Sequence, residues 1–354
     1  MNISDRSAVA LSWVARLAFV TVVLLTGYWI TTINGPTSSI IDQLARTPLS
    51  QVVKFVAVCT LIRLALAPAI ATVPAHLRGP GFMMDRIVNE ALDAVIYAGV
   101  FVFLIIRPFC VQAFKIPSES MQNTLLVGDY IVANKAIYRY SDPKVGDIVV
   151  FRPPAWACTP DQVDQGTGEV NVDFIKRCQG VPGDLVEVRN GTLYRNGIPQ
   201  KEPYVADRMN NDFKLIKYKD QTTDPAWRQW LSNADPGLPD NESHRYLAKL
   251  WDKVAATTPK TRFEYWPLVM SGTSVNQEQS YTAVPYHVPE EDEKLADKLR
   301  AMPPVKIPPG YYLMMGDNRN GSFDGRAWGL VPRDDIIGRS EFIWMPVQRW
   351  RITR

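Results

Sequence analysis

Cysteine and histidine are scarce in this chain of 354 residues, which contains four cysteines and three histidines. His76, His244 and His287 lie far apart, and no spacing of cysteine and histidine matches a zinc site, so we expect no metal centre. The low cysteine count also limits disulfide bonds. Cys158 and Cys178 either pair, if this part of the chain lies outside the cytoplasm, or remain two free thiols.

An excess of charge of either sign is also missing. The 39 basic residues nearly balance the 36 acidic ones, for a net charge of +3. No basic cluster with interleaved aromatic residues stands out, so neither nucleic acid nor an acidic partner is expected. The chain contains no internal repeat, and its hydrophobic residues are spread unevenly: long apolar runs dominate the first third.

Three apolar runs predict a membrane anchor over residues 1–108. They cover about residues 12–33, 52–73 and 87–106, and each is close to the ~20 residues that a membrane-spanning helix needs. The first run is alternatively a cleavable signal peptide, although the stretch from Thr31 to Gly35 is a poor cleavage site. The second run contains Arg63, which must reach the interface or face a partner helix. This run is alternatively an amphipathic helix lying on the membrane.

Basic residues in the short loops predict the orientation, because cytoplasmic loops carry an excess of lysine and arginine. Arg6 and Arg16 flank the start of the first run, Arg78 and Arg86 lie between the second and third, and the first loop contains Arg46. This pattern places the N-terminus inside the cytoplasm and the C-terminal part outside. If only two runs span, the N-terminus moves outside and the C-terminal part stays there.

Beyond about Phe109, short alternating strands separated by turn residues predict a mainly antiparallel β domain. The predicted strands are 129–133, 147–151, 172–175, 185–188, 193–195, 311–315 and 340–344. A polar segment over 201–304 divides this domain into residues 109–200 and 305–354. Helices are predicted in the segment at 242–255 and at 290–302, where Leu295 and Leu299 form an apolar face. We therefore expect a mixed α/β insert that forms a non-catalytic subdomain.

A serine and a lysine in the β domain are candidates for joint chemistry. Ser120 lies in the stretch Ile116-Pro117-Ser118-Glu119-Ser120-Met121, shortly after the third apolar run. A serine hydroxyl needs a base, and lysine can serve when burial lowers its pKa. Lys176 is the best candidate because it ends an apolar strand that begins near Phe174, while alternation predicts that Arg177 faces the other way and stays in water. Taken singly, each residue is also compatible with an ordinary turn serine and a surface lysine.

Four ordered blocks resemble type I signal peptidases, the bacterial leader peptidases. They are Ser-x-Ser-Met at 118–121, Val145–Phe151, Lys-Arg-x-x-Gly-x-Pro-Gly-Asp at 176–184, and Met-Gly-Asp-Asn-Arg at 315–319. The resemblance covers about residues 100–200 and 305–345 and implies a signal-peptidase-like β fold. It also implies a serine endopeptidase with a Ser/Lys dyad that removes N-terminal signal peptides from exported preproteins at the membrane surface. Such acyl transfer requires no cofactor.

The resemblance also implies the roles of individual residues. It makes Ser120 the nucleophile, Lys176 the general base, Ser118 the oxyanion-hole serine, Ser322 the serine that orients the lysine, and Asp324 and Arg326 a supporting pair. It places the substrate strand beside residues 114–117, which include Pro117, and 173–175, which begin with Asp173. We expect the walls of the substrate pockets, or alternatively plain core packing, from Ile116, Met121, Leu125, Phe174 and Ile175. The chain departs from the family pattern at Glu119, Asn123 and Asn320-Gly321, which stands where Asp-Asn is commoner. None of these changes removes a reactive group.

The implied location is the bacterial inner (cytoplasmic) membrane, with several spans and the catalytic domain on the periplasmic or extracytoplasmic face. The implied partners are exported preproteins, the phospholipid bilayer and the secretion translocase. Two alternatives stay open: a specialised maturation protease with a narrow substrate set, which the polar insert would serve, and a membrane-tethered assembly protein with an inactive β domain. A self-cleaving repressor shares a Ser/Lys mechanism, but the membrane runs argue against it.

Overall fold

The computed structural model describes residues 49–72, 75, 78, 80–106, 109–164, 166–205, 207–218, 253–256, 258–271 and 293–353, with residues 10, 13, 17, 20, 21 and 24. Most of the predicted run at 12–33 and most of the helix predicted at 242–255 lie outside the described residues. The chain divides into two compact units, Met1–Phe114 and Lys115–Arg354.

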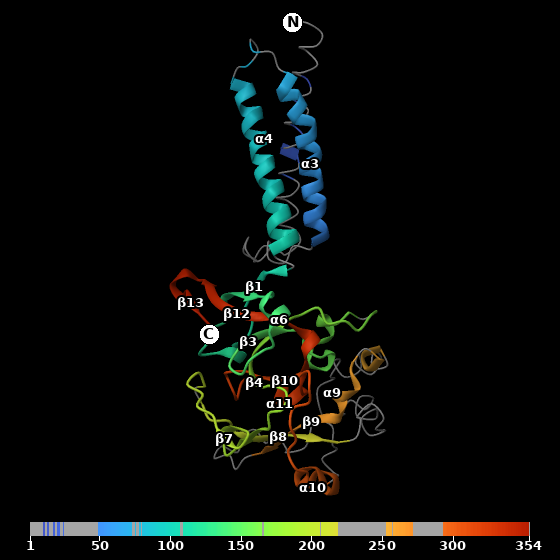
Figure 1. Ribbon diagram of the computed structural model, residues 1–354, viewed down its shortest axis with the longest axis vertical. Helices are drawn as coiled ribbons and strands as arrows, with labels where there is room; N and C mark the ends of the chain where they lie inside the picture. Colours follow the sequence, from blue (N-terminus) through green and yellow to red (C-terminus); the bar gives the residue numbers. More distant parts are fainter. Residues whose placement is uncertain are drawn as a thin grey trace. The chain divides into compact units, whose positions relative to one another are not determined.

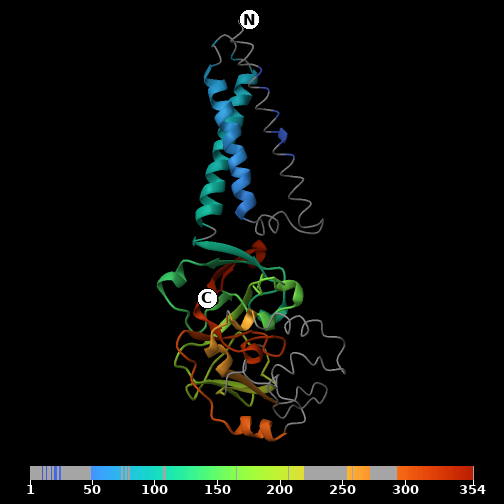
Figure 2. The ribbon, with the colours of Figure 1, turned by 90° about the vertical axis from the view of Figure 1, so that its right-hand side faces the viewer.

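Two long helices make up most of the described part of the first unit. They are α3 (Leu49–Thr72) and α4 (Pro80–Ala98), which continues as the π-helical η2 (Gly99–Ile106). The helices lie side by side (Figures 1 and 2) and pack through the buried residues Cys59, Ile62, Leu66 and Leu92. Both occur where apolar runs were predicted at 52–73 and 87–106. Among the described residues, one helical stretch, Ser50–Pro68, is long and apolar enough to cross a membrane.

Arg63, the charge inside the second predicted run, faces the partner helix. Its Nε donates to Oδ1 of Asp93 on α4, and its Nη2 donates to Oδ2 at 3.2 Å. Ionised side chains within apolar helices are costly unless they find a partner. The pair therefore explains how α3 carries an arginine near its middle, and it links the two helices at this level.

From Val111 onward the described strands form two sheets. Among the described residues the first sheet has eight strands in the order β1-β2-β12-β3-β4-β10-β11, with β13 paired to β12. These strands are β1 (Val111–Lys115), β2 (Tyr130–Asn134), β3 (Ile148–Phe151), β4 (Phe174–Gly180), β10 (Tyr311–Met315), β11 (Val331–Pro332), β12 (Ile336–Met345) and β13 (Arg351–Ile352). The pairs from β2 through β12, β3, β4 and β10 to β11 are antiparallel, which confirms the predicted antiparallel β domain.

The second sheet has the order β7-β6-β5-β8-β9. Its strands are β5 (Val186–Arg189), β6 (Thr192–Arg195), β7 (Ile198–Pro199), β8 (Asn211–Lys217) and β9 (Tyr265–Ser271). The β5–β6 hairpin turns at Asn190-Gly191, where both residues have positive φ (50° and 72°), as this type of tight turn requires. Strands β8 and β9 come from the polar insert, so part of the insert extends the sheet that this hairpin begins (Figure 1).

The short helices of the second unit lie around the sheets. They are η3 (Glu119–Met121), α6 (Ile137–Tyr140), η4 (Ala155–Ala157), η5 (Pro160–Gln162), α9 (Lys260–Glu264), α10 (Glu293–Ala301), α11 (Gly325–Trp328), η7 (Arg333–Asp335) and η8 (Val347–Arg349). Helix α10 confirms the helix predicted at 290–302, and its Leu299 is buried against Ile216, Trp266 and Leu268 of β8 and β9.

Strand β10 joins the cores on the two faces of the first sheet. All five of its residues are buried, because Tyr311, Leu313 and Met315 pack among residues of the second sheet while Tyr312 and Met314 pack on the other face. This alternation follows from the opposite directions of successive strand side chains. Cys178 lies in the second of these clusters and is a free thiol, as is the buried Cys158. The first sheet thus provides a rigid, doubly covered scaffold for β4.

Candidate active site

Ser120 and Lys176 meet in the structure although they are 56 positions apart. Ser120 belongs to η3, and Lys176 lies in β4. Nζ of Lys176 donates to Oγ of Ser120 at 2.8 Å and to the carbonyl oxygen of Ile175 at 3.1 Å. Oγ of Ser118 lies 3.3 Å from Oγ of Ser120. Two hydroxyls and one amine therefore occupy a single small site.

Lys176 is buried, with 5% of its surface exposed. Burial disfavours the ammonium and lowers the pKa of Lys176 to about 8, against a smaller opposite effect of the carboxylates of Asp324 and Asp317. The ring of Phe174, on the same strand face, lies 5.3 Å from Nζ. A lysine with this pKa exists partly as the neutral amine near neutral pH, and that amine can accept the proton of a neighbouring hydroxyl.

The turn that follows β10 packs closely against Ser120; we call residues 316–326 the Gly316 turn. A Cβ atom on Gly316 would lie 2.2 Å from Oγ of Ser322 and 2.4 Å from the carbonyl oxygen of Ser120, so only glycine fits. The N–H of Asn318 donates to the same Ser120 carbonyl at 3.1 Å. Its side-chain Nδ2 donates to the carbonyl oxygen of Glu119 at 3.2 Å. The turn therefore fixes the backbone that carries Ser120.

Ser322 borders the same space as the carbonyl of Ser120. Its Oγ is buried and has no hydrogen-bond partner among the described residues. Within that part of the chain, no hydrogen bond joins it to Lys176, whose amine is directed to Ser120 and Ile175. The predicted orientation of the lysine by Ser322 therefore stays a prediction.

Asp324 and Arg326 pair within the Gly316 turn. Asp324 precedes α11, and its carboxylate accepts from the N–H of Gly316 at 2.8 Å and from Nε of Arg326 at 2.9 Å. Burial alone would raise the pKa of Asp324, but the Arg326 guanidinium and the N–H groups of Gly316 and Arg326 hold it below its usual range. Nη2 of Arg326 donates to the carbonyl oxygen of Arg319 at 2.6 Å. The pair closes the turn on itself.

Arg177 is the residue whose predicted environment is wrong. Alternation along β4 turns it away from Lys176, but it is only 6% exposed instead of lying in water. Its Nε and Nη2 donate to the two carboxylate oxygens of Asp317 at 2.8 and 2.6 Å. Oγ1 of Thr124 donates to the same carboxylate at 2.5 Å. The Gly316 turn supplies the countercharge that allows this face of β4 to be buried.

The predicted substrate-binding residues fall into two groups. Pro117 and Asp173 are exposed, and Phe174 is half-buried. The other four, Ile116, Met121, Leu125 and Ile175, are buried. The first group can contact a substrate directly, whereas the second can act only as packing beneath the surface.

Sequence reasoning missed several neighbours of the site. Asp317 stands inside a block used for the resemblance, but no sequence pattern indicated that it pairs with Arg177. Thr124, Glu202 and Tyr204 were not singled out either, although each contacts an arginine of the site. The charged residues inside the blocks were the available signal, because buried charges need partners.

Comparisons with known proteins show the family to which the chain belongs. The family model for signal peptidase, peptidase S26, matches residues 88–345. Signal peptidase I of Aquifex aeolicus (strain VF5) is 32% identical over 68% of this chain and 78% of its own length. Signal peptidase I of Pseudomonas fluorescens is 27% identical over 82% of this chain and 89% of its own. A solved signal peptidase I from Enterococcus faecalis V583 aligns with 56% of this chain and 97% of that chain at 21% identity, with a TM-score of 0.24.

The family model and the curated relatives place the chain in the class of serine endopeptidases. Within that class, the chain belongs to the signal peptidase family, peptidase S26.

Proposed function

We propose that this protein is a signal peptidase I in which Ser120 is the nucleophile and Lys176 the general base. Its substrates are exported preproteins, from which it removes N-terminal signal peptides. The observation that carries the dyad is the 2.8 Å contact between Oγ of Ser120 and the amine of the buried Lys176. A lysine of lowered pKa beside a serine is the arrangement that activates a hydroxyl without histidine.

In the proposed mechanism, neutral Lys176 accepts the proton of Ser120 as Oγ attacks the scissile carbonyl. The protonated lysine then gives its proton to the leaving amine, and water hydrolyses the acyl-enzyme with Lys176 again as the base. The hydroxyl of Ser118 and the backbone N–H of Ser120 are proposed to bind the developing oxyanion. One such donor lowers the barrier by about 3–4 kcal/mol.

Three other residues are proposed to support these groups. Ser322 orients Lys176, a role supported by its buried hydroxyl, which has no partner among the described residues. Asp324 and Arg326 hold the turn that carries Ser322, as their mutual ion pair at 2.9 Å supports. None of the three needs to touch the substrate for this purpose.

The substrate is proposed to bind as an extended strand next to residues 114–117 and 173–175. Backbone hydrogen bonds to an exposed edge provide affinity in this mode, and pockets for alternate side chains provide specificity. Pro117, Asp173 and Phe174 are proposed to contact the peptide. Ile116, Met121, Leu125 and Ile175 are proposed to shape two shallow apolar pockets from below.

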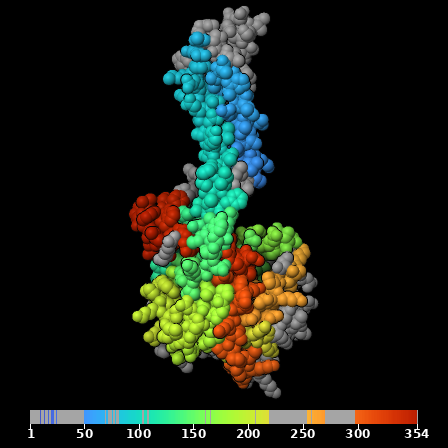
Figure 3. All heavy atoms as spheres, viewed as in Figure 1, coloured from blue at the N-terminus to red at the C-terminus, as the bar shows by residue number. Residues whose placement is uncertain are grey.

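We further propose that the chain is a multi-pass protein of the bacterial inner membrane, with the catalytic domain on the periplasmic or extracytoplasmic face. Residues 12–33, α3 and the continuous α4–η2 would be the spans, and the apolar stretch Ser50–Pro68 supports this for α3. The bilayer is also proposed to contact Val347, Trp350 and Ile352, which are 62–68% exposed in the C-terminal segment (red in Figure 3). Tryptophan favours the membrane interface. The secretion translocase stays a predicted partner.

The test is cleavage of a preprotein with small residues at the first and third positions before the cut, by detergent-solubilised protein. Wild type should cut at that bond, whereas Ser120→Ala and Lys176→Ala should not. Cleavage by Ser120→Ala would overturn the proposal.

A narrow-substrate maturation protease is the second candidate, favoured by the inserted strands β8 and β9 and helix α10. A panel of unrelated preproteins separates the two candidates. Broad cleavage supports the general enzyme, whereas cleavage of a single class of preprotein supports the specialised one.

A further inference from the structure

Glu202, at the start of the polar insert, is bound to the Gly316 turn. Its Oε2 accepts from Nη1 of Arg319 at 3.0 Å, and its Oε1 accepts from Nη2 of the same residue. The side chains are 10% and 0% exposed. Nε of Arg319 donates in turn to the carbonyl oxygen of Gly316 at 2.8 Å. Arg319 therefore connects Glu202 to Gly316, the glycine that packs against Ser120.

Tyr204 supports the other side of the site. Its ring centre lies 3.9 Å from Cζ of Arg177, the residue next to Lys176. Its hydroxyl accepts from Nε2 of Gln179 at 3.0 Å and donates to Oε1 of Glu202 at 3.2 Å. Glu202 and Tyr204 are thus hydrogen-bonded to each other. Glu202 binds Arg319 of the Gly316 turn, and Tyr204 contacts Arg177, which binds Asp317 of the same turn.

Asn320 joins the same two segments through its amide. Its Nδ2 donates to the carbonyl oxygen of Arg208 at 3.0 Å, and its Oδ1 accepts from the N–H of Asn210 at 3.1 Å. An aspartate, which is commoner at this position in the resembling family, has no N–H to donate to the Arg208 carbonyl. The departure at Asn320 therefore adds a hydrogen bond between the insert and the turn.

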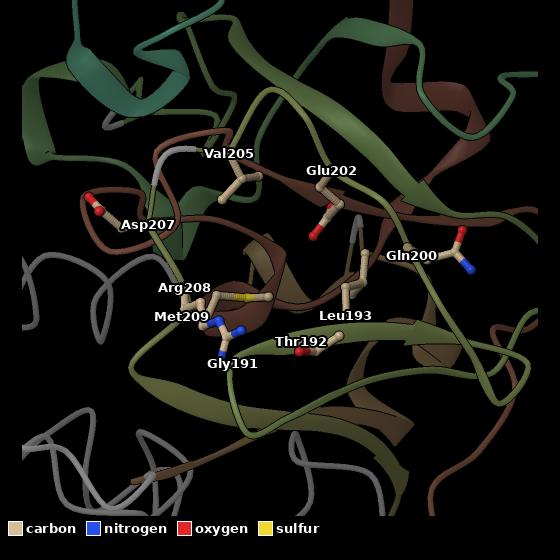
Figure 4. Close-up of a pocket in the computed structure, with 9 residues that line it drawn as sticks. All are labelled: Gly191, Thr192, Leu193, Gln200, Glu202, Val205, Asp207, Arg208 and Met209. Carbon is tan, nitrogen blue, oxygen red and sulfur yellow. The ribbon is translucent and has the colours of Figure 1, made fainter.

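A cavity of about 180 Å³ lies beside this segment. Figure 4 shows its lining, which includes Glu202 and Met209, and both of these residues also contact Arg319. Glu202 and Met209 therefore border this open pocket and contact the Gly316 turn at the same time.

We propose that Glu202 and Tyr204 are positioning residues for peptide cleavage: they hold Arg319 and Arg177, and through them they hold the Gly316 turn against Ser120 and Lys176. The inference rests on the proposed function. It makes the first residues of the insert part of the active-site support, although the insert was expected to be a non-catalytic subdomain.

The surroundings of Lys176 give the inference a specific readout. The charged groups that act on it, Asp324 and Asp317, both belong to the Gly316 turn. Val149, the neighbour of Lys176 on β3, is apolar. Met315 of β10, which pairs with the adjacent Arg177, is apolar too. A displaced turn admits water to the lysine, so its pKa moves back toward the ordinary value of 10.5.

The experiment compares Glu202→Gln and Tyr204→Ala with wild type in preprotein cleavage, with rates expressed per active molecule. We expect kcat to fall about tenfold with little change in KM, because misplacement affects the transition state more than binding. The acidic limb of the pH–rate profile should move to higher pH in both variants. Tyr204→Phe keeps the ring over Arg177 and should retain most of the activity.

Glu264→Gln is the control. Like Glu202, Glu264 lies in the insert and pairs with a cation, but its partner is Lys217, at 3.4 Å, which is itself part of the insert. This variant should leave the rate and the pH profile unchanged. A lower Tm in Glu202→Gln and Tyr204→Ala, with kcat per active molecule and the pH limb unchanged, would overturn the inference. If Glu202→Gln does not fold, equal activities of Tyr204→Ala and Tyr204→Phe would overturn it.

Ser120→Ala, measured in the same assay, distinguishes a failure of the proposed function from a failure of the positioning role. Activity in that variant, or none in wild type, means that the proposed function fails. An active wild type and an inactive Ser120→Ala, together with an unaffected Glu202→Gln, mean that only the positioning role fails.

Discussion

Each unit of the chain contains an arginine–aspartate pair between neighbouring elements, and the two pairs differ in setting. In the helical unit, Arg63 and Asp93 join α3 to α4, with side chains 36% and 32% exposed. In the β unit, Arg177 and Asp317 join β4 to the Gly316 turn, with side chains 7% and 0% exposed. Buried pairs contribute geometry more reliably than net stability. The same chemistry thus fixes helix against helix in one unit and turn against strand in the other.

Lys176 differs from both arginines. Among the described residues it forms no ion pair, and its amine contacts a hydroxyl and a carbonyl. An arginine cannot lose its proton in a protein, whereas a buried lysine can. In the described part of the chain, the two structural arginines are therefore paired with carboxylates, whereas the lysine that is proposed to lose its proton is not.

The largest effect is expected from exchanging one kind of cation for the other. Lys176→Arg keeps a buried positive charge but cannot act as a base, so cleavage should fall by about 10³-fold or more. Initial rates of preprotein cleavage measure this, with circular dichroism as the check on folding. An active Lys176→Arg would remove the distinction between the reactive and the structural cations.

A pH titration tests the same distinction without mutation. The lowered pKa of Lys176, about 8, means that the neutral base predominates above that pH and disappears below it. The rate should therefore rise about tenfold per pH unit through mildly acidic and neutral pH and level off above the lysine pKa. The measurement is kcat/KM from pH 5.5 to 9.5. A flat profile over this range would contradict the role of Lys176 as base.

A smaller effect is expected from crowding the turn that Arg177 and Asp317 anchor. Gly316→Ala places a Cβ against the carbonyl of Ser120 and the hydroxyl of Ser322. We therefore expect kcat to fall by about 10- to 100-fold. Gly166→Ala is the control, because its Cβ would meet only a side-chain oxygen of Asp164 at 3.2 Å. Equal kcat values for the two variants would show that the turn yields to the added atom.

The smallest effect is expected in the helical unit. Arg63→Asp opposes Asp93 with a like charge and should destabilise the helix pair by about 1–2 kcal/mol, which the double exchange Arg63→Asp/Asp93→Arg should restore. Thermal unfolding in detergent measures both. Arg86→Glu is the control, because its pair with Glu90 is 63% and 69% exposed and contributes little. If the double exchange does not recover stability, the Arg63–Asp93 pair does not link the two helices.

Contiguous patterns explain most of what could be predicted from the sequence. Strands β2, β3 and β10 alternate or form short apolar runs bounded by turns, and Ser120 and Lys176 stand in compact blocks. The environment of Arg177 could not be predicted in this way, because its partner Asp317 is 140 positions away. Strands β8 and β9 also escaped prediction, because they pair with each other across residues 218–264. Local patterns define elements, whereas countercharges and sheet neighbours depend on the assembled fold.

Gly316 has a consequence for how this site can change over generations. Every other amino acid carries the Cβ atom that the space between Ser120 and Ser322 excludes. Any missense mutation of its codon therefore damages the site itself. Variation in the Gly316 turn must therefore arise at its other residues, and Gly316, which is buried, should stay unchanged.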